Sequence, residues 1–501
     1  MVHDAQFCNN QSLIKTNQNM KKLNTLLTQL RPTQVVGPTN IDITNVVCDS
    51  RQIKGGELFV AVVGVAVDAH RFIPQVTQAG AAAVLCQTLP QSLADGVTYV
   101  VVPDTTSALA LVASEWYDRP SEHLRLVGVT GTNGKTTTAT LLYELMQHLG
   151  YKAGLLSTVK NVIDRREEPA TQTTPDHLNL NRLLHEMVVA GCDYAFMEVS
   201  SHACVQHRID GLHWAGGVFT NLTQDHLDFH KTMDEYLRAK KMFFDALPTD
   251  AFALVNADDK VGRVMLQNCR ASHHTYALRT MADYNCRLLE ERIDGMSLQI
   301  NGRDVEVQLT GRFNAYNLTA IAATAMLLGI GRDDVLVALS QLHAADGRFQ
   351  TLHAPKGYTA IVDYAHTPDA LINVLDTIRD LVRGRGQIIC VCGCGGDRDA
   401  TKRPIMAHEA ALRSDRTILT SDNPRTEDPD AILRDMESGL TDDDRQHTIK
   451  ITDRREAIRT ACLLAQPGDV VLVAGKGHET YQDVMGVKHH FDDREELRAC
   501  F

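Results

Sequence analysis

The amino-acid sequence predicts an α/β fold divided into three domains. Its 501 residues are too many for a single hydrophobic core, since domains usually hold about 100–200 residues. Apolar runs of strand length alternate with stretches of helical periodicity, which is typical of sheets covered by helices. Turn-rich polar stretches at residues 118–122 and 344–348 predict domains at 1–120, 121–346 and 347–501.

Composition excludes several classes of protein. Fifty Lys and Arg stand against 62 Asp and Glu, a net charge of −12, which argues against a general binder of nucleic acid or anionic membranes. No apolar run approaches the roughly 20 residues of a membrane span, and the polar residues 1–19 lack the apolar core of a signal peptide. Twelve scattered cysteines suit a reducing compartment, so we expect a cytoplasmic protein.

The first domain is expected to be a small α/β unit. Short apolar runs predict strands at residues 58–63, 82–86 and 97–102, separated by helix-patterned segments.

The second domain begins with the most informative motif of the chain. An apolar run at 124–129 is followed by a glycine-rich turn and then by a predicted helix at 138–149, the order found in phosphate-binding loops. The turn, called the phosphate loop below, consists of Gly131, Thr132, Asn133, Gly134, Lys135, Thr136 and Thr137. Its glycines let backbone N–H groups surround phosphate oxygens, Lys135 adds a positive charge, and the Thr136 hydroxyl can ligate Mg²⁺.

This loop departs from the usual motif at one position, because Val129 stands where the first glycine is expected. A chance Gly-Lys-Thr in a surface turn is the alternative, but it does not explain the strand and helix on either side. The motif therefore predicts a nucleoside triphosphate site in a central P-loop ATPase-type sheet domain, with further strands at 194–199 and 217–220.

Two acidic features follow in the same domain. Glu198 ends an otherwise apolar strand, where it fits a Mg²⁺ ligand facing the phosphate loop; a solvated carboxylate at a strand end is the alternative. Residues 225–230 then place two carboxylates and two imidazoles, including His226, within six positions. Metal or phosphate chemistry is one interpretation, and a polar loop closed by helix caps is the other.

Lys240 occupies an unusual position in the predicted helix 233–247. Apolar or aromatic residues recur along one face of this helix, and Lys240 fills the position where that face should continue. Burial would lower the pKa of the amine, and the neutral amine could take up CO₂ to form a carbamate that ligates a metal. A lysine that snorkels from the edge of the face is an equally good interpretation.

The third domain is predicted to be a Rossmann-like, doubly wound sheet. Its strands and helices alternate regularly, with strands at 359–363, 387–392, 417–420, 448–451 and 470–473 and helices at 368–382, 402–412, 428–440 and 454–464. Ligands bind beyond the carboxyl ends of such strands, where this sequence carries polar clusters at 363–366, 393–398, 422–425 and 475–479. Cys390, Cys392 and Cys394 alternate along one strand, which favours packing on one face over metal binding.

One of these clusters is suited to binding an amino acid. Arg425 can bind a carboxylate through two parallel hydrogen bonds, while Asp422 and Asn423 contact an ammonium group. A β-turn would also explain Asp, Asn and Pro here. Arg398 and Glu479 follow the ends of other strands and bring further charges to the same edge.

Taken together, these motifs resemble those of the Mur ligases, ATP-dependent amide-forming enzymes of bacterial cell-wall synthesis that share their architecture with folylpolyglutamate synthase. The resemblance covers nearly the whole chain. It is carried by residues 49–51 with 58–61, the phosphate loop, 198–202, 225–228 and the four C-terminal clusters.

The resemblance implies a set of site residues. ATP would be held by the phosphate loop with Asn317 and Asp363, and Mg²⁺ by Thr136, Glu198, His226 and Lys240 as its carbamate, N6-carboxylysine. Catalysis would involve Lys135, Glu198, His226 and Lys240. The UDP-sugar precursor would contact Cys48, Ser50, Val65, Ala66, Val67, Gln172, Thr173, Thr174, Ser200, Gln206 and Arg208. The incoming amino acid would contact Arg398, Asp422, Asn423, Pro424, Arg425, Gly475 and Glu479.

The resemblance also implies an activity. Arg425 suits the second carboxylate of meso-2,6-diaminopimelate, so the expected reaction adds this amino acid to UDP-N-acetylmuramoyl-L-alanyl-D-glutamate through an acyl phosphate. A cytoplasmic monomer acting on small molecules in peptidoglycan synthesis, and thereby in cell shape and division, is expected. Two alternatives remain open: a related ligase that adds lysine or extends folate, and a nucleotide-dependent switch that forms no amide.

Overall fold

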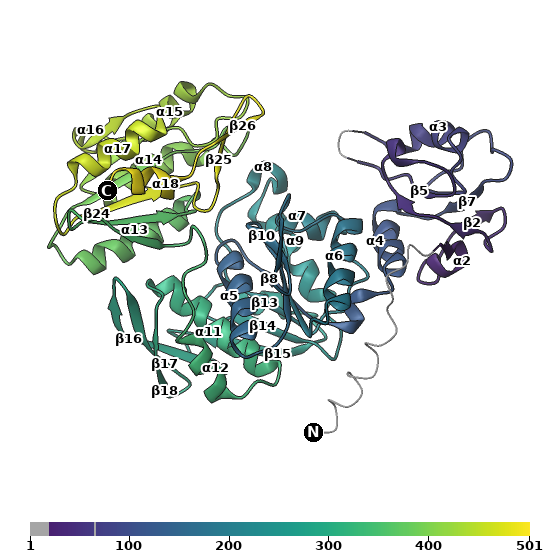
Figure 1. Cartoon of the computed structure of the whole chain (residues 1–501), viewed down its shortest axis with the longest axis horizontal. Coiled ribbons are helices and arrows are strands. Elements are labelled where there is room, and N and C mark those ends of the chain that lie inside the picture. Colours follow the sequence, from purple (N-terminus) through teal and green to yellow (C-terminus); the bar gives the residue numbers. More distant parts are fainter. Residues whose placement is uncertain (1–19, 65–66) are drawn as a thin grey trace.

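The computed structural model describes residues 20–64 and 67–501, so the prediction for residues 1–19 lies outside the described residues. Figure 1 shows an N-terminal part (purple) beside a central part (blue to teal) and a C-terminal part (green to yellow). Each part contains its own main sheet with helices packed against it, so the predicted three-part α/β fold is confirmed. Within the described ranges, no helix is both long and apolar enough to cross a membrane.

The N-terminal sheet has the strand order β2-β7-β6-β5-β4. These strands are β2 (Gln34–Val36), β7 (Thr98–Val101), β6 (Ala83–Cys86), β5 (Leu58–Val60) and β4 (Val46–Val47). Its other elements are β1 (Lys21–Lys22), α2 (Leu23–Leu26), β3 (Asp42–Ile43), η2 (Ser50–Gln52), η3 (Ala69–Phe72), α3 (Ile73–Gln78) and α4 (Thr105–Trp116). The strand predicted to reach Val63 ends at Val60, because the chain turns as the Val62 N–H bonds back to the Val60 carbonyl at 3.1 Å.

The central sheet has the order β11-β10-β9-β12-β8-β13-β14-β15-β16-β17-β18. Its strands are β8 (Arg125–Thr130), β9 (Ala153–Leu156), β10 (Lys160–Ile163), β11 (Arg166–Pro169), β12 (Tyr194–Glu198), β13 (Gly216–Phe219), β14 (Phe252–Asn256), β15 (Ser272–Ala277), β16 (Tyr284–Arg292), β17 (Gly295–Ile300) and β18 (Arg303–Val307). Strands β9 and β12 to β16 run parallel to β8, and antiparallel strands extend the sheet at both edges. The phosphate loop follows β8, which lies between β12 and β13.

Helices cover both faces of this sheet and form two apolar cores. They are η4 (Pro120–His123), α5 (Lys135–His148), α6 (His177–Val189), α7 (Ser201–Val205), α8 (Leu227–His230), α9 (Met233–Asp245), α10 (Gly262–Met265), α11 (Arg312–Leu327) and α12 (Arg332–Leu339). Helix α5 begins at Lys135 rather than at the predicted Thr138, because Gly134 adopts the left-handed conformation that precedes a helix (φ 87°). The phosphate-loop lysine is therefore the first residue of a helix.

The C-terminal sheet has the order β19-β20-β24-β21-β22-β23, with β20 to β24 parallel and β19 antiparallel at one edge. The strands are β19 (Gln350–His353), β20 (Thr359–Asp363), β21 (Ile388–Cys392), β22 (Arg416–Leu419), β23 (Thr448–Lys450) and β24 (Val470–Ala474). The helices are α13 (Pro368–Val382), α14 (Lys402–Arg413), α15 (Pro429–Glu437), α16 (Asp442–Gln446), α17 (Arg454–Leu464) and α18 (Asp493–Ala499).

Two apolar cores lie on opposite faces of this sheet, which confirms the predicted doubly wound arrangement. Cys390, Cys392 and Cys394 belong to one core, whereas the intervening Ile389 and Val391 belong to the other. The three cysteines therefore pack on one face, as the sequence predicted.

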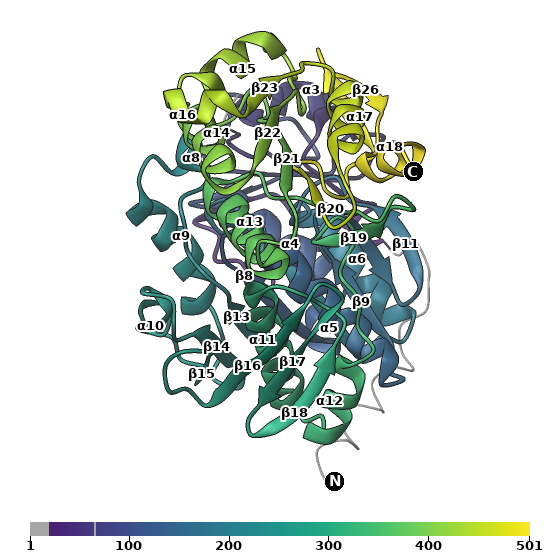
Figure 2. The same ribbon diagram turned by 90° about the vertical axis from the view of Figure 1, so that its left-hand side faces the viewer.

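A two-stranded hairpin, which the sequence analysis did not predict, follows this sheet. It consists of β25 (Tyr481–Val484) and β26 (Val487–His490). Figure 2 shows the C-terminal part (green to yellow) above the central part, with α13 on the side that faces the central part.

Candidate active site

The phosphate loop can be built only with glycine at two positions. A Cβ at Gly131 (φ 148°) would lie 1.9 Å from the Thr220 hydroxyl, and one at Gly134 would lie 2.5 Å from the Asn317 side-chain oxygen. Lys135 folds over the loop and donates to the carbonyls of Gly131 at 3.0 Å and Thr132 at 2.8 Å. The loop thus already has the curvature and the positive charge that phosphates require.

Lys240 of α9 is buried against this loop rather than snorkelling to solvent. Its side chain is 1% exposed, and its Nζ donates to the Gly131 carbonyl at 2.7 Å and lies 4.5 Å from the centre of the Tyr236 ring. Burial lowers the pKa of Lys240 well below its usual value, and the charge of Lys135 lowers it further. A neutral amine beside the nucleotide site is the state that can react with CO₂.

Glu198 and Thr136 offer oxygen ligands to a cation beside the phosphate loop. Glu198 ends β12 with 1% of its surface exposed, and its Oε1 accepts from the Thr158 N–H at 2.7 Å. Both side chains line the same cavity as His226. No group of three or more His, Cys, Asp or Glu side chains forms a metal site in residues 20–64 and 67–501. A Mg²⁺ ion that keeps waters and phosphate oxygens needs only one or two protein ligands, so these residues fit it.

The histidines of the 225–230 segment lie beside the phosphate loop. His226 adopts a positive φ of 54° at the start of α8, and its ring lies 5.0 Å from that of His202, centre to centre. Burial lowers the pKa of His226 to about 3. The imidazole is therefore neutral near pH 7 and can act as a metal ligand. His230 lies deeper, with its Nε2 2.8 Å from the Ser201 hydroxyl.

The residues predicted to hold the precursor in the central domain form one hydrogen-bonded network. Arg208 donates to the Thr174 carbonyl at 2.7 Å and to the Gln206 side chain at 2.6 and 2.9 Å, and it also bonds Gln172. The Ser200 N–H donates to the Thr174 hydroxyl at 3.1 Å. Thr158 connects Thr173 to the predicted cation ligand Glu198. Its hydroxyl donates to the Thr173 hydroxyl at 3.0 Å, and its N–H donates to Glu198 at 2.7 Å.

Three of the predicted amino-acid residues, Asp422, Asn423 and Glu479, meet around a buried lysine, Lys476, whose role was not predicted from the sequence. Lys476 is fully buried; its Nζ donates to the Asn423 side chain at 3.0 Å and lies 3.3 Å from Glu479 and 3.8 Å from Asp422. Burial, and then the neighbouring Asp422, raise the pKa of Glu479. Gly475 lies against Asp422, where a Cβ would be 2.4 Å from the carboxylate.

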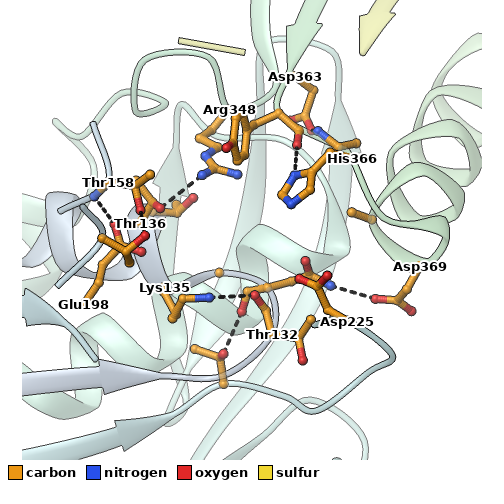
Figure 3. Close-up of a pocket in the computed structure, with 18 of the residues that line it drawn as sticks. Thr132, Lys135, Thr136, Thr158, Glu198, Asp225, Arg348, Asp363, His366 and Asp369 are labelled. Atoms are coloured by element: carbon orange, nitrogen blue, oxygen red, sulfur yellow. Dashed lines mark hydrogen bonds between the residues drawn. The ribbon is translucent and has the colours of Figure 1, made fainter. Parts of the chain in front are cut away.

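Two hydrogen bonds across the domains bring these sites together. Arg348 donates to the Thr136 hydroxyl at 3.0 Å, and the Asn133 side chain donates to Asp369 of α13 at 2.9 Å (Figure 3). Asp363 is held by the N–H groups of Phe349 and Ala365, each at 2.7 Å, and burial raises its pKa. Neither Arg348 nor Asp369 was predicted from the sequence, where the only signal was the position of Arg348 at the end of the turn-rich 344–348 stretch.

A cavity of about 1560 Å³ runs between the central and C-terminal domains. Its lining includes most of the predicted residues: Thr132, Asn133, Gly134, Lys135, Thr136, Thr137, Gln172, Thr173, Thr174, Glu198, Ser200, Arg208, His226, Lys240, Asn317, Asp363, Arg398, Asp422, Asn423, Arg425, Gly475 and Glu479. One space thus joins the nucleotide, precursor and amino-acid residues.

The predicted residues of the N-terminal domain lie elsewhere. Among the described residues, Cys48, Ser50 and Val67 do not line this cavity. Cys48 and Val67 are exposed, and Ser50 begins η2. Val65 and Ala66 lie outside the described residues.

Comparison with known proteins gives consistent matches along the chain. Residues 42–117 match the model described as Mur ligase family, catalytic domain, residues 129–325 the Mur ligase middle domain, and residues 347–477 the Mur ligase, glutamate ligase domain. A Bacteroides fragilis protein named UDP-N-acetylmuramoyl-L-alanyl-D-glutamate–2,6-diaminopimelate ligase is 55% identical over 480 residues, covering 96% of this chain and 99% of the relative. A Parabacteroides distasonis protein of the same name is 56% identical with the same coverage.

Solved structures agree with these matches. The structure of a UDP-N-acetylmuramoyl-L-alanyl-D-glutamate–2,6-diaminopimelate ligase aligns with a TM-score of 0.69 and 32% identity, covering 96% of this chain and 99% of that one. The Thermotoga maritima MurF ligase in complex with ADP aligns with a TM-score of 0.61 and 18% identity over 91% and 96% of the two chains, which shows the shared fold.

Proposed function

The chain belongs to the Mur ligase family, and we propose that it is the ATP-dependent ligase that joins meso-2,6-diaminopimelate to UDP-N-acetylmuramoyl-L-alanyl-D-glutamate in peptidoglycan precursor synthesis. The family resemblance noted in the sequence is therefore confirmed. Through the cell wall, this activity would contribute to cell shape, cell division and the cell cycle. We further propose that the enzyme works as a cytoplasmic monomer.

The observation that carries this proposal is the shared cavity. Lys135 of the phosphate loop, Arg208 of the precursor network and Arg425 of the amino-acid cluster all line it. A ligase must bring a triphosphate, a carboxylate and an amine together, and holding them in one space removes most of the entropic cost of their meeting. A nucleotide switch would not need the precursor network around Arg208 or the amino-acid cluster around Arg425.

In the first step, the γ-carboxylate oxygen of the D-glutamyl residue attacks the γ-phosphorus of ATP, which gives an acyl phosphate and ADP. Lys135 would leave the carbonyls of Gly131 and Thr132 to stabilise the charge on the transferred phosphoryl group. Arg348, which now bonds Thr136 at 3.0 Å, carries a second positive charge to the same place. Positioning and charge neutralisation account for most of the catalysis in such a step.

Mg²⁺, held by Thr136, Glu198 and His226, would neutralise phosphate charge. We propose that Lys240 adds a carbamate to this ligand set. Its burial and its lowered pKa support this assignment, and a carbamate keeps one N–H with which to bond the Gly131 carbonyl.

In the second step, the neutral amine of diaminopimelate attacks the acyl carbon, and the resulting tetrahedral intermediate expels phosphate and loses the amine proton. Asp422 and Glu479 would bind the ammonium group at the other end of the amino acid, while Arg398 and Arg425 would bind its carboxylates. The second carboxylate distinguishes diaminopimelate from lysine, and an arginine beside it gives the selectivity.

Amide formation with alternative amino acids tests this function. With ATP and the dipeptide precursor, diaminopimelate should give a tripeptide product and lysine should give far less; the opposite preference would overturn the assignment. Oxygen-18 in the precursor carboxylate should appear in the released phosphate. Phosphate release that needs neither cosubstrate would instead indicate a nucleotide switch.

Replacement of Arg425 by Lys isolates the selectivity. It keeps the positive charge but loses the bidentate geometry, so the KM for diaminopimelate should rise roughly 10- to 100-fold while the KM for ATP stays constant. Arg416→Lys, an exposed position on β22 of the same domain, is the matched control. Equal losses for both substrates would mean that Arg425 serves the fold instead.

A further inference from the structure

Arg425 is held in place from two directions. Its main chain adopts a positive φ of 52°, its N–H donates to the Asp483 carbonyl at 3.0 Å, and its own carbonyl accepts from the Met485 N–H at 2.7 Å. Its side chain donates from Nη1 to the Gly396 carbonyl at 2.7 Å. One edge of the guanidinium is therefore occupied by protein, and its direction depends on where Gly396 lies.

The position of Gly396 is in turn fixed by its neighbour Asp397. The Asp397 carboxylate accepts from the Thr426 N–H at 3.1 Å and from the Thr426 hydroxyl at 2.7 Å. The Gly396 N–H donates to the Asn423 carbonyl at 2.9 Å. These bonds fasten the loop after β21 to the loop after β22, on either side of the arginine.

The buried Arg403 stabilises the contact between these two loops through Glu427. Arg403 is 3% exposed and donates to both oxygens of Glu427 at 2.8 and 2.9 Å, and Glu427 accepts the N–H of Asp397. The exposed Asp397 thus has its own main chain anchored to the protein interior. A carboxylate with both oxygens engaged and its main chain anchored can transmit a fixed geometry to Gly396.

We propose that Asp397 and Thr426 form a positioning pair that sets the selectivity of the amino-acid site, acting through Gly396 on the guanidinium of Arg425. Neither residue needs to touch the substrate. Arginine has several rotatable bonds, and ordering them during binding weakens affinity, so a guanidinium oriented in advance binds a carboxylate more tightly. The inference rests on the proposed function, because it assigns the second carboxylate of diaminopimelate to Arg425.

Three variants test the pair, with lysine as an internal control. Thr426→Val removes the hydroxyl donor while keeping shape and the N–H, Thr426→Ser keeps the hydroxyl, and Asp397→Ala removes both acceptors. Loss of one hydrogen bond to a charged group predicts that kcat/KM for diaminopimelate falls roughly tenfold in Thr426→Val, and loss of both bonds predicts a fall at least as large in Asp397→Ala. The slow reaction with lysine, which has no second carboxylate, should be unchanged, as should the KM for ATP, and Thr426→Ser should behave as wild type.

The matched control is Thr452→Val. Thr452 donates to Asp430 at 2.6 Å in the same domain, and neither residue lines the cavity. This variant removes an equivalent exposed bond and should keep the wild-type selectivity. Thermal unfolding of each variant reports any general loss of structure.

A double-mutant cycle gives the sharpest test. If Thr426 acts through Arg425, Thr426→Val should not lower kcat/KM for diaminopimelate any further in the Arg425→Lys background. If the two residues act independently, the fold losses in kcat/KM should multiply. Multiplying effects, or parallel changes for diaminopimelate, lysine and ATP, would overturn the inference. Wild-type enzyme that fails to use diaminopimelate would instead overturn the proposed function, so the two failures are distinguishable.

Discussion

Gly134→Ala should damage the nucleotide site more than it damages the fold. Gly134 has a φ of 87°, so an alanine there pays about 1–2 kcal/mol of left-handed strain. Its Cβ would also lie 2.5 Å from the Asn317 side-chain oxygen, and Asn317 would have to move. That movement breaks its 3.2 Å bond to Asn314, worth about 1 kcal/mol, and displaces a residue predicted to lie near the adenosine.

Gly150 offers an unusually close control. It lies just beyond the other end of α5 with a φ of 84°, and a Cβ there would meet nothing within 4 Å. Gly150→Ala therefore carries the same backbone strain without the collision. The difference between the two variants isolates the displacement of Asn317.

Steady-state kinetics and thermal unfolding of the two variants check this reasoning. Both should lose about 1–2 kcal/mol of stability through strain, and Gly134→Ala about 1 kcal/mol more through the lost Asn317 bond. Only Gly134→Ala should raise the KM for ATP, by about tenfold or more. The KM for diaminopimelate should stay constant in both. An equal rise in the KM for ATP in Gly150→Ala, or an unchanged KM in Gly134→Ala, would refute a role for the displacement of Asn317.

Three further outcomes are expected. Lys240→Gln should lower kcat roughly a hundredfold and remove a carbamate signal seen by NMR with ¹³C-bicarbonate, unlike the neighbouring Lys241→Gln; a wild type without that signal contradicts the modification. Burial raises the pKa of Glu144 to about 7, so the folded state holds this proton more tightly and stability falls as pH rises from about 4.5 to 7. Glu144→Gln should therefore gain about 1–2 kcal/mol over wild type at pH 8 but little at pH 4.5, and an equal difference at both pH values argues against this. Chelation of Mg²⁺ should abolish product formation, and Thr136→Val should raise the Mg²⁺ needed for half-maximal rate about tenfold while Thr136→Ser does not; an unchanged requirement in Thr136→Val counts against a ligand role.

The sequence could predict the elements whose burial leaves a periodic pattern. The doubly wound sheet follows from regularly spaced apolar runs. The gap in the helical stripe at Lys240 allowed both an inward and a snorkelling lysine, and the structure buries it. The strands of the β25–β26 hairpin are at most half-buried and show no apolar alternation. A single glycine, Gly486, marks its turn in the sequence; in the structure Met485 and Gly486 both have a positive φ.

Contacts between segments far apart in the sequence could not be predicted from local sequence patterns. Arg348 and Thr136 are 212 positions apart, and Asn133 and Asp369 are 236 apart. Such pairs depend on how two domains pack, and neither periodicity nor spacing encodes that. Some of the residues lining the cavity could be named because they lie at or just after the end of a parallel strand, where polar side chains are exposed; Glu198, Asp363 and Asp422 are examples. Asn317 and Arg208 lie in or after helices and were named only from the family resemblance.

The carbonyl of Gly131 accepts hydrogen bonds from two amines, those of Lys135 and Lys240. When a nucleotide draws Lys135 toward its phosphates, the second donor remains. A buried oxygen stripped of every partner would cost about 1–3 kcal/mol, and that penalty would be subtracted from the affinity for ATP. Redundancy at one backbone atom therefore lets the catalytic lysine change partners without weakening the loop that carries it.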